Sequence, residues 1–205
     1  MNEILAVATI TILAVISPGP DFAMVTRQSY TYGIKTGLLC AFGIAIGVQV
    51  HVFYTIFGIT LIIMSSSALF LAVKLTGVCY LVYIGFKSFT NKIKIAADST
   101  ASTQPISKFN AFKIGFLTNA LNPKTMFFVV SVYSQVIQVG NSVWLNLGYG
   151  VFISLVHLVW FSLIALFFAT PSVRNKVLSY QSVMDKTIGI LLVLLGFSLL
   201  FFNIN

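Results

Sequence analysis

Two short polar stretches interrupt apolar parts of the sequence, and both contain proline. A proline inside a helix lacks a backbone donor and clashes with the carbonyl group four residues before it, so each stretch predicts a broken helix with freed amides and carbonyls. Together with a carboxylate and an ammonium group, such a backbone could bind a small molecule that carries both charges. The candidate binding residues are Pro18, Gly19, Pro20 and Asp21 in the first stretch and Asn122, Pro123 and Lys124 in the second.

Asp21 is the ionisable residue that follows the first break, and Lys124 follows the second. A carboxylate also favours the first turn of a helix, beside unpaired backbone amides, so Asp21 could act as a capping acid as well as a binding group. These two roles are compatible. If the breaks meet in the fold, a pair formed by Asp21 and Lys124 would compensate both charges.

His51 and His157 are the histidines of the chain, and they lie 106 residues apart. Imidazole titrates near neutral pH, so both residues are candidates, with Asp21, for coupling proton movement. The alternative is that each histidine is a hydrogen-bonded packing residue. No cysteine or further acid accompanies them in the sequence, so neither a metal site nor a set of catalytic residues is expected.

The composition places these residues in a membrane. Of 205 residues, 58% are hydrophobic and 8% are charged, and the mean hydropathy is +0.99. A water-soluble globule would need a far more charged surface. The net charge of +8 comes from side chains that lie between apolar segments without interleaved aromatics. This pattern indicates lipid headgroups, and not nucleic acid, as their partners.

Six segments are long and apolar enough to cross a bilayer, whose core needs roughly 20 helical residues. A backbone in lipid must satisfy its own hydrogen bonds, and no regular alternation suggests a barrel, so the chain is predicted to be an all-α integral membrane protein. The first and fourth segments carry the proline breaks. The predicted spans are Ile4–Tyr30, Gly37–Met64, Ala68–Phe89, Phe112–Ile137, Val143–Ala169 and Thr187–Phe202.

Positive side chains concentrate in three of the connections between these spans. The positive-inside rule assigns that face to the cytoplasm, so both termini are expected to face away from it. The residues concerned are Arg27, Lys35, Lys87, Lys92, Lys94, Lys108, Lys113, Arg174, Lys176 and Lys186.

Three motifs recur in the same order in both halves of the chain. Proline breaks recur at a separation of 105 residues, Val-His pairs at 106 and a Lys-x-x-Gly pattern at 112. We therefore predict one transmembrane domain, 1–205, in which three-helix repeats over 1–90 and 111–205 are joined by a cytoplasmic linker over 91–110. Because three is odd, the repeats enter the membrane from opposite sides. Inverted repeats of this kind are typical of secondary transporters, whose sites lie where broken helices meet.

The sequence also resembles a known family over nearly its full length. The similar stretches read SPGPDFAMV, GIKTGLLCAFGIAIGVQVH, KLTGVCYLVYIGFK and NALNPKTMFF. They are similar to the lysine and homoserine/threonine exporter family, the LysE/RhtB-type amino-acid efflux proteins. The resemblance implies a six-span protein of the bacterial cytoplasmic (inner) membrane that exports amino acids or close derivatives, driven by a proton gradient and without a cofactor. The segment SVYSQVIQ lacks the Pro-Gln-Phe expected of the homoserine/threonine members.

The predicted function is transport of a small zwitterionic substrate out of the cytoplasm by proton antiport, with one three-helix half rocking against the other. Two alternatives use the same polar core. One is a membrane-embedded enzyme with Asp21 and the histidines as acid and base, and the other is a scaffold subunit that exposes faces of small residues. The identity of the amino acid, the proton stoichiometry and the formation of a homo-oligomer are left open.

Overall fold

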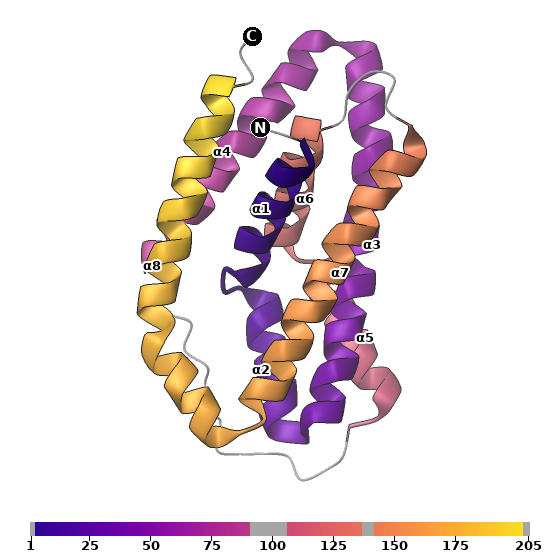
Figure 1. The fold of residues 1–205 in the computed structure, drawn as a ribbon. Coiled ribbons are helices and arrows are strands. Elements are labelled where there is room, and N and C mark those ends of the chain that lie inside the picture. Colours follow the sequence, from indigo (N-terminus) through magenta and orange to yellow (C-terminus); the bar gives the residue numbers. More distant parts are fainter. Residues whose placement is uncertain (1–2, 91–105, 137–141, 203–205) are drawn as a thin grey trace.

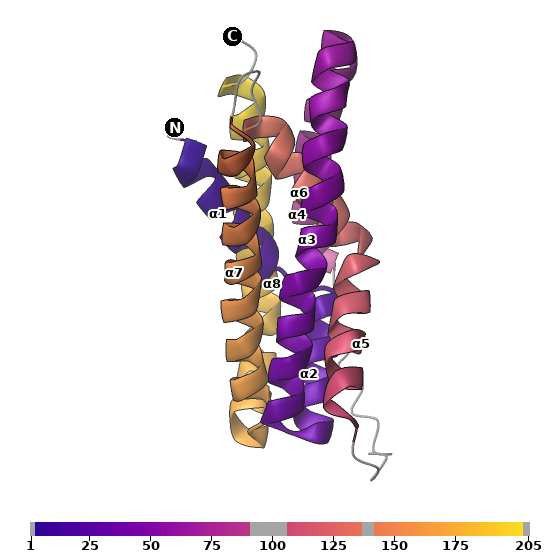
Figure 2. The same ribbon diagram turned by 90° about the vertical axis from the view of Figure 1, so that its right-hand side faces the viewer.

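The computed structural model describes residues 3–90, 106–136 and 142–202. All regular elements in these ranges are α-helices, which confirms the all-α prediction for the described part of the chain. The helices form an elongated bundle along one axis (Figure 1, Figure 2). Their bounds are α1 Glu3–Ile16, α2 Pro20–Tyr32, α3 Ile34–Ser65, α4 Ser67–Thr90, α5 Lys108–Ala120, α6 Pro123–Val136, α7 Val143–Phe168 and α8 Pro171–Phe202.

The two proline stretches break helices where the sequence predicts it. The first predicted span consists of α1 and α2, which are bent by 53° at the break. The fourth consists of α5 and α6, and the break between them ends at Asn122. In both cases the second helix begins with proline, at Pro20 and Pro123, because a proline at the first helical position loses no internal hydrogen bond.

Helices α3, α4 and α7 are each long and apolar enough to cross a membrane. The bent pair α1 and α2 meets the same criterion when both helices are counted as one span. Within the described residues, neither α8 nor the pair α5 and α6 is among the candidate spans. The count of six spans therefore stays a prediction.

Two predicted boundaries differ from the structure. The last helix begins at Pro171 and not at Thr187, because the polar segment before the apolar run is also helical and starts with a favourable proline. The predicted linker over 91–110 is shortened at its end, where α5 already begins at Lys108 and the Ser107 hydroxyl caps it by accepting from the Asn110 amide at 3.2 Å. Residues 91–105 of that linker lie outside the described residues.

The two halves of the chain run in opposite senses. In Figure 1, α1 and α2 descend, α3 ascends and α4 descends, whereas α5 and α6 ascend, α7 descends and α8 ascends. The end of α2 and the beginnings of α3, α5 and α8 lie at the lower end. These segments carry Arg27, Lys35, Lys108, Lys113, Arg174 and Lys176.

The breaks lie between two buried apolar clusters. One cluster contains residues of α1 and α6 and the upper parts of α3 and α7, including Ile10 and Tyr133. The other contains residues of α2 and the lower parts of α3 and α7, including Val25 and Phe168. Polar groups at the breaks are therefore enclosed by apolar layers along the bundle axis.

The closest helix packing joins the two halves of the chain. Helix α3 packs most extensively on α5, and α4 packs most extensively on α8. A methyl group on Gly115 would overlap the Cys40 carbonyl oxygen, and one on Gly43 would overlap that of Phe112, so α3 and α5 lie backbone to backbone. The predicted rocking of one three-helix half against the other stays a prediction.

Candidate functional site

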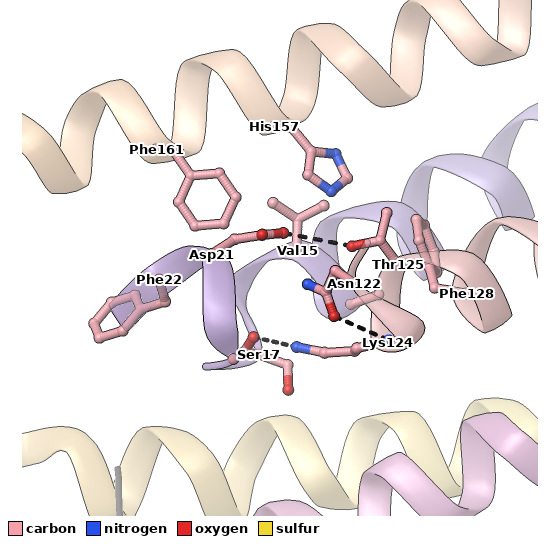
Figure 3. Close-up of a pocket in the computed structure, with 12 residues that line it drawn as sticks. Val15, Ser17, Asp21, Phe22, Asn122, Lys124, Thr125, Phe128, His157 and Phe161 are labelled. Carbon is pink, nitrogen blue, oxygen red and sulfur yellow. Dashed lines mark hydrogen bonds between the residues drawn. The ribbon is translucent and has the colours of Figure 1, made fainter. Parts of the chain in front are cut away.

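The two breaks face each other in the middle of the bundle, and Figure 3 shows their side chains. Asp21 is the second residue of α2, and Lys124 is the second residue of α6. By position in the helix, Pro20 is therefore the counterpart of Pro123. The separation of 105 residues between the proline breaks is counted from Pro18, which lies two residues before the start of α2.

Asp21 is buried, with 5% of its surface exposed. Its Oδ2 accepts a hydrogen bond of 2.8 Å from the Asn119 side-chain amide and a longer one of 3.4 Å from the Thr125 hydroxyl. Its Oδ1 has no partner among the described residues. The carboxylate lies in the first turn of α2 without capping it by a side-chain hydrogen bond, so one of its oxygens is available for another group.

Lys124 and Asp21 interact electrostatically, as expected of the predicted charge pair, but Lys124 donates its hydrogen bond elsewhere. Its Nζ donates instead to the backbone carbonyl of Ser17, a group that the first break releases from the helix. Gly19 permits this arrangement, since a Cβ atom there would lie 3.1 Å from the Lys124 Cδ. Asn122 caps the second broken helix, because its Oδ1 accepts from the Lys124 amide at 3.0 Å.

His51 is fixed behind the site by two hydrogen bonds. Its Nε2 lies 2.8 Å from the Asn119 carbonyl oxygen, and its Nδ1 lies 2.6 Å from the Tyr54 hydroxyl. A carbonyl oxygen can only accept, so Nε2 is the donor and Nδ1 accepts from Tyr54. The same carbonyl accepts from the Asn122 amide at 2.8 Å. His51 therefore holds the end of α5. It contacts the backbone carbonyl of Asn119, whereas the side chain of the same residue contacts the Asp21 carboxylate.

His157 is placed differently. Its Nδ1 lies 2.8 Å from the Ile153 carbonyl oxygen, so Nδ1 carries the hydrogen and donates. The ring lines the same cavity as Asp21, and Figure 3 shows it pointing toward the residues of the breaks. The structure thus brings one of the two predicted histidines into the site and leaves the other outside it.

Two of the cavities are lined by residues of both breaks. The smaller one, about 20 Å³, is lined by Asp21, Thr125 and His157 and has room for about one water molecule. The larger one, about 500 Å³, lies toward α4 and is lined by the broken backbone on both sides. Lys124 lines both cavities. The residues shared by the two cavities are Ser17, Gly19, Asn122 and Lys124.

The sequence interpretation missed Asn119 and Thr125, which hold the Asp21 carboxylate. Both are buried polar residues within four positions of Pro123. In the sequence, both could have been found as polar residues in an apolar segment beside a proline break. Within the described ranges, no three side chains among histidine, cysteine, aspartate and glutamate come close enough to hold a metal ion.

Comparisons with known proteins identify the family of the chain. The sequence model of the family described as LysE type translocator matches residues 12–202. The chain is 30% identical over 204 residues to an uncharacterized membrane protein, YrhP, of Bacillus subtilis (strain 168), covering 96% of this chain and 97% of the relative. It is 32% identical over 175 residues to the threonine efflux protein of Escherichia coli (strain K12), covering 83% and 84% of the two chains.

A further relative aligns over a shorter region. The leucine efflux protein of Salmonella choleraesuis (strain SC-B67) is 33% identical over 129 residues, covering 62% of this chain and 60% of the relative. No solved structure matches the chain significantly. Since the family match extends over most of the sequence and includes both breaks, this chain belongs to the LysE type translocator family.

Proposed function

We propose that this protein is a secondary transporter that exports amino acids or close derivatives from the cytoplasm. One observation carries the proposal: a buried Asp21 oxygen without a partner in the described structure lies where two proline-started helices face each other. A buried carboxylate at membrane depth is energetically costly, and for this reason such a residue marks a candidate functional site. Membership of a translocator family supports transport, and relatives named as threonine and leucine efflux proteins support amino acids as the cargo.

The substrate binds between the breaks in this proposal. The positive ends of the helix dipoles at the starts of α2 and α6 attract its carboxylate. The Ser17 carbonyl and Asp21 accept from its ammonium group. The proposed binding residues are Pro18, Gly19, Pro20, Asp21, Asn122, Pro123 and Lys124.

The larger cavity suits such a substrate in size and lining. Its volume of about 500 Å³ lies within the usual range for small-molecule pockets, roughly 300–1,000 Å³. Tyr80 and Tyr83 of α4 form part of its wall, opposite the broken backbone. An amino acid in this cavity would meet both breaks at once.

Proton antiport follows if a proton and the substrate compete for one carboxylate. Asp21 can hold either a proton or the ammonium group on its free oxygen, so binding of one would favour release of the other. His157 lines the same small cavity and could exchange the proton through a water molecule. Among the candidates Asp21, His51 and His157, the geometry favours Asp21 with His157.

The proposal includes two inverted three-helix repeats in the bacterial cytoplasmic membrane, with both termini outside the cytoplasm. The opposite senses of the two halves support the inverted repeats (Figure 1). The positive residues at the lower end of the bundle support the orientation, because basic residues favour the cytoplasmic face.

Counterflow in liposomes tests the export function. Liposomes with the purified full-length chain are loaded with one unlabelled amino acid, and entry of the labelled form is followed, beginning with threonine and leucine. A carrier accumulates the unaltered label transiently, because efflux of the unlabelled pool drives the exchange. If no amino acid of the standard set shows counterflow, the proposal is wrong. Chemical conversion of the label would indicate a membrane-embedded enzyme instead.

A further inference from the structure

The Lys124 ammonium group lies against the first break. Its Nζ donates to the Ser17 carbonyl, which has no helical partner because of the first break. The side chain crosses from the start of α6 over Gly19, and a Cβ atom on that residue would lie 3.3 Å from Nζ. An ammonium group thus already lies against the broken backbone of the opposite half.

Charged groups of three helices act on the Lys124 ammonium group. Asp21 of α2 and Asp185 of α8 attract it, and Lys87 of α4 repels it. Asp185 is buried, and its Oδ1 has no partner in the described part of the chain. The freed Ser17 carbonyl can accept from any primary ammonium group, whether it belongs to lysine or to an amino acid, and the two carboxylates attract such a charge.

The Lys124 side chain also borders both cavities. Lys124 lines the small cavity that contains Asp21 and the large one that extends toward α4. Its backbone is held at both sides, since its amide donates to Asn122 and its carbonyl accepts from the Tyr80 hydroxyl at 3.4 Å. The flexible side chain can therefore move while the start of α6 stays in place.

We propose that the Lys124 ammonium group is an internal substitute for the amino group of the substrate. It holds the Ser17 carbonyl when the site is empty and leaves that carbonyl when a substrate ammonium group arrives from the larger cavity. This inference rests on the proposed export function and specifies its binding step. An empty site would otherwise leave a buried carboxylate uncompensated, which is strongly unfavourable in a membrane.

The test uses n-butylammonium chloride, which reproduces the end of a lysine side chain and lacks a carboxylate. Thermal unfolding of the full-length protein in detergent is followed as its concentration rises. In Lys124→Met the cation position is vacant, so n-butylammonium should raise the unfolding temperature. Wild type should need an about tenfold higher concentration for the same shift, because its own ammonium group competes.

Two controls make the result specific. Tetramethylammonium chloride has the charge but no N–H donor, so it should not stabilise Lys124→Met. Lys74→Met removes another lysine within a predicted span, which lies over the Phe70 ring and outside both cavities, and it should respond as wild type does. Equal responses of wild type and Lys124→Met, or a response to both cations, would overturn the inference.

Gly19→Ala provides a second variant if Lys124→Met does not fold. The added methyl group would press on the Lys124 Cδ and Nζ, and the extended backbone at Gly19 accepts any residue. The Lys124 ammonium group should then bind the Ser17 carbonyl more weakly. n-Butylammonium should therefore raise the unfolding temperature of this variant at a lower concentration than that of wild type. Amino-acid counterflow with no n-butylammonium response in either variant would contradict the inference and leave the export function standing. Absence of counterflow contradicts the export function and, with it, the assignment of the position to a substrate.

Discussion

The Asn119 side-chain amide donates to the Asp21 carboxylate across 2.8 Å, and this hydrogen bond joins the end of α5 to the beginning of α2. The backbone carbonyl of Asn119 at the same time accepts from His51 and from the Asn122 amide. A single residue therefore connects the carboxylate, one histidine and the second break. Its position determines how the two halves of the chain meet at the site.

Replacement of Asp21 tests the proposed proton coupling. Asp21→Asn keeps the size and the hydrogen-bonding reach but removes the titratable charge. Efflux driven by a pH gradient in proteoliposomes should fall to the level of protein-free liposomes, and exchange at equal pH should lose its dependence on pH. Normal pH-dependent efflux by this variant would eliminate the coupling role of Asp21 and leave the histidines as candidates.

Removal of the Asn119 amide should destabilise the fold. Asn119→Ala leaves a buried carboxylate without its shorter hydrogen bond, which costs about 1–3 kcal/mol. The free energy of unfolding in detergent measures the loss. In the Asp21→Asn background the same change should cost less, since no buried charge is left. An equal loss of unfolding free energy in both backgrounds would show that the hydrogen bond to the charged carboxylate is not the cause of the destabilisation.

The two histidines should behave differently. His157→Gln removes a titratable ring from the cavity that contains Asp21, so the pH dependence of amino-acid exchange should shift. His51→Gln removes the group that holds the Asn119 carbonyl, so it should lower the unfolding temperature and leave the pH midpoint of exchange unchanged. If only the His51 variant changed the pH midpoint of exchange, His51 and not His157 would be the histidine involved in proton coupling.

Replacement of two helical glycines by alanine should have opposite effects on stability, because one glycine lies in the contact between α3 and α5 and the other lies in open space. Gly115→Ala forces a methyl group into the Cys40 carbonyl, and overpacking of this kind costs about 1–3 kcal/mol. Gly148→Ala, in α7, meets no atom within 4 Å and should stabilise the helix by about 0.5–1 kcal/mol. The unfolding temperature should fall in Gly115→Ala and rise in Gly148→Ala relative to wild type. Similar values for both would contradict the close packing of α3 and α5.

A reporter enzyme that works only outside the cytoplasm tests the orientation. Fused after Asn205 it should be active, and inserted between Asp98 and Pro105 it should be inactive, because the basic residues mark the cytoplasmic face. A cytoplasmic reporter at the same two sites should give the reverse pattern. Activity of the first reporter at both sites, or only at the internal one, would contradict the proposed orientation.

Backbone features of the site could be predicted from the sequence, because proline acts locally. The breaks and the helix starts at Pro20 and Pro123 follow from a missing donor and a fixed torsion angle, whatever the rest of the fold does. The start of α8 could not be found in the same way. Hydropathy marks the apolar run from Thr187, whereas the helix also includes the polar turns from Pro171.

Side-chain partners could not be predicted from spacing alone. Charge suggests a pair of Asp21 and Lys124, and the two do interact electrostatically. Their hydrogen-bond partners are different residues: Asn119 lies 98 residues from Asp21, and the Ser17 carbonyl lies 107 residues from Lys124. Whether a carbonyl is free to accept depends on the local path of the backbone, which sequence separation does not show. The same reason explains why His51 and His157, which match in sequence, have different surroundings.

The backbone contact between α3 and α5 also constrains how the protein is made. Helix α3 is synthesised well before α5, so it enters the bilayer with a groove at Gly43 that is shaped for a helix not yet present. The first half of the chain is therefore an incomplete folding unit, and lipid must fill that groove until the second half displaces it. Assembly of the site is a late event in biogenesis, since Asp21 receives its hydrogen bonds only when Asn119 and Thr125 arrive.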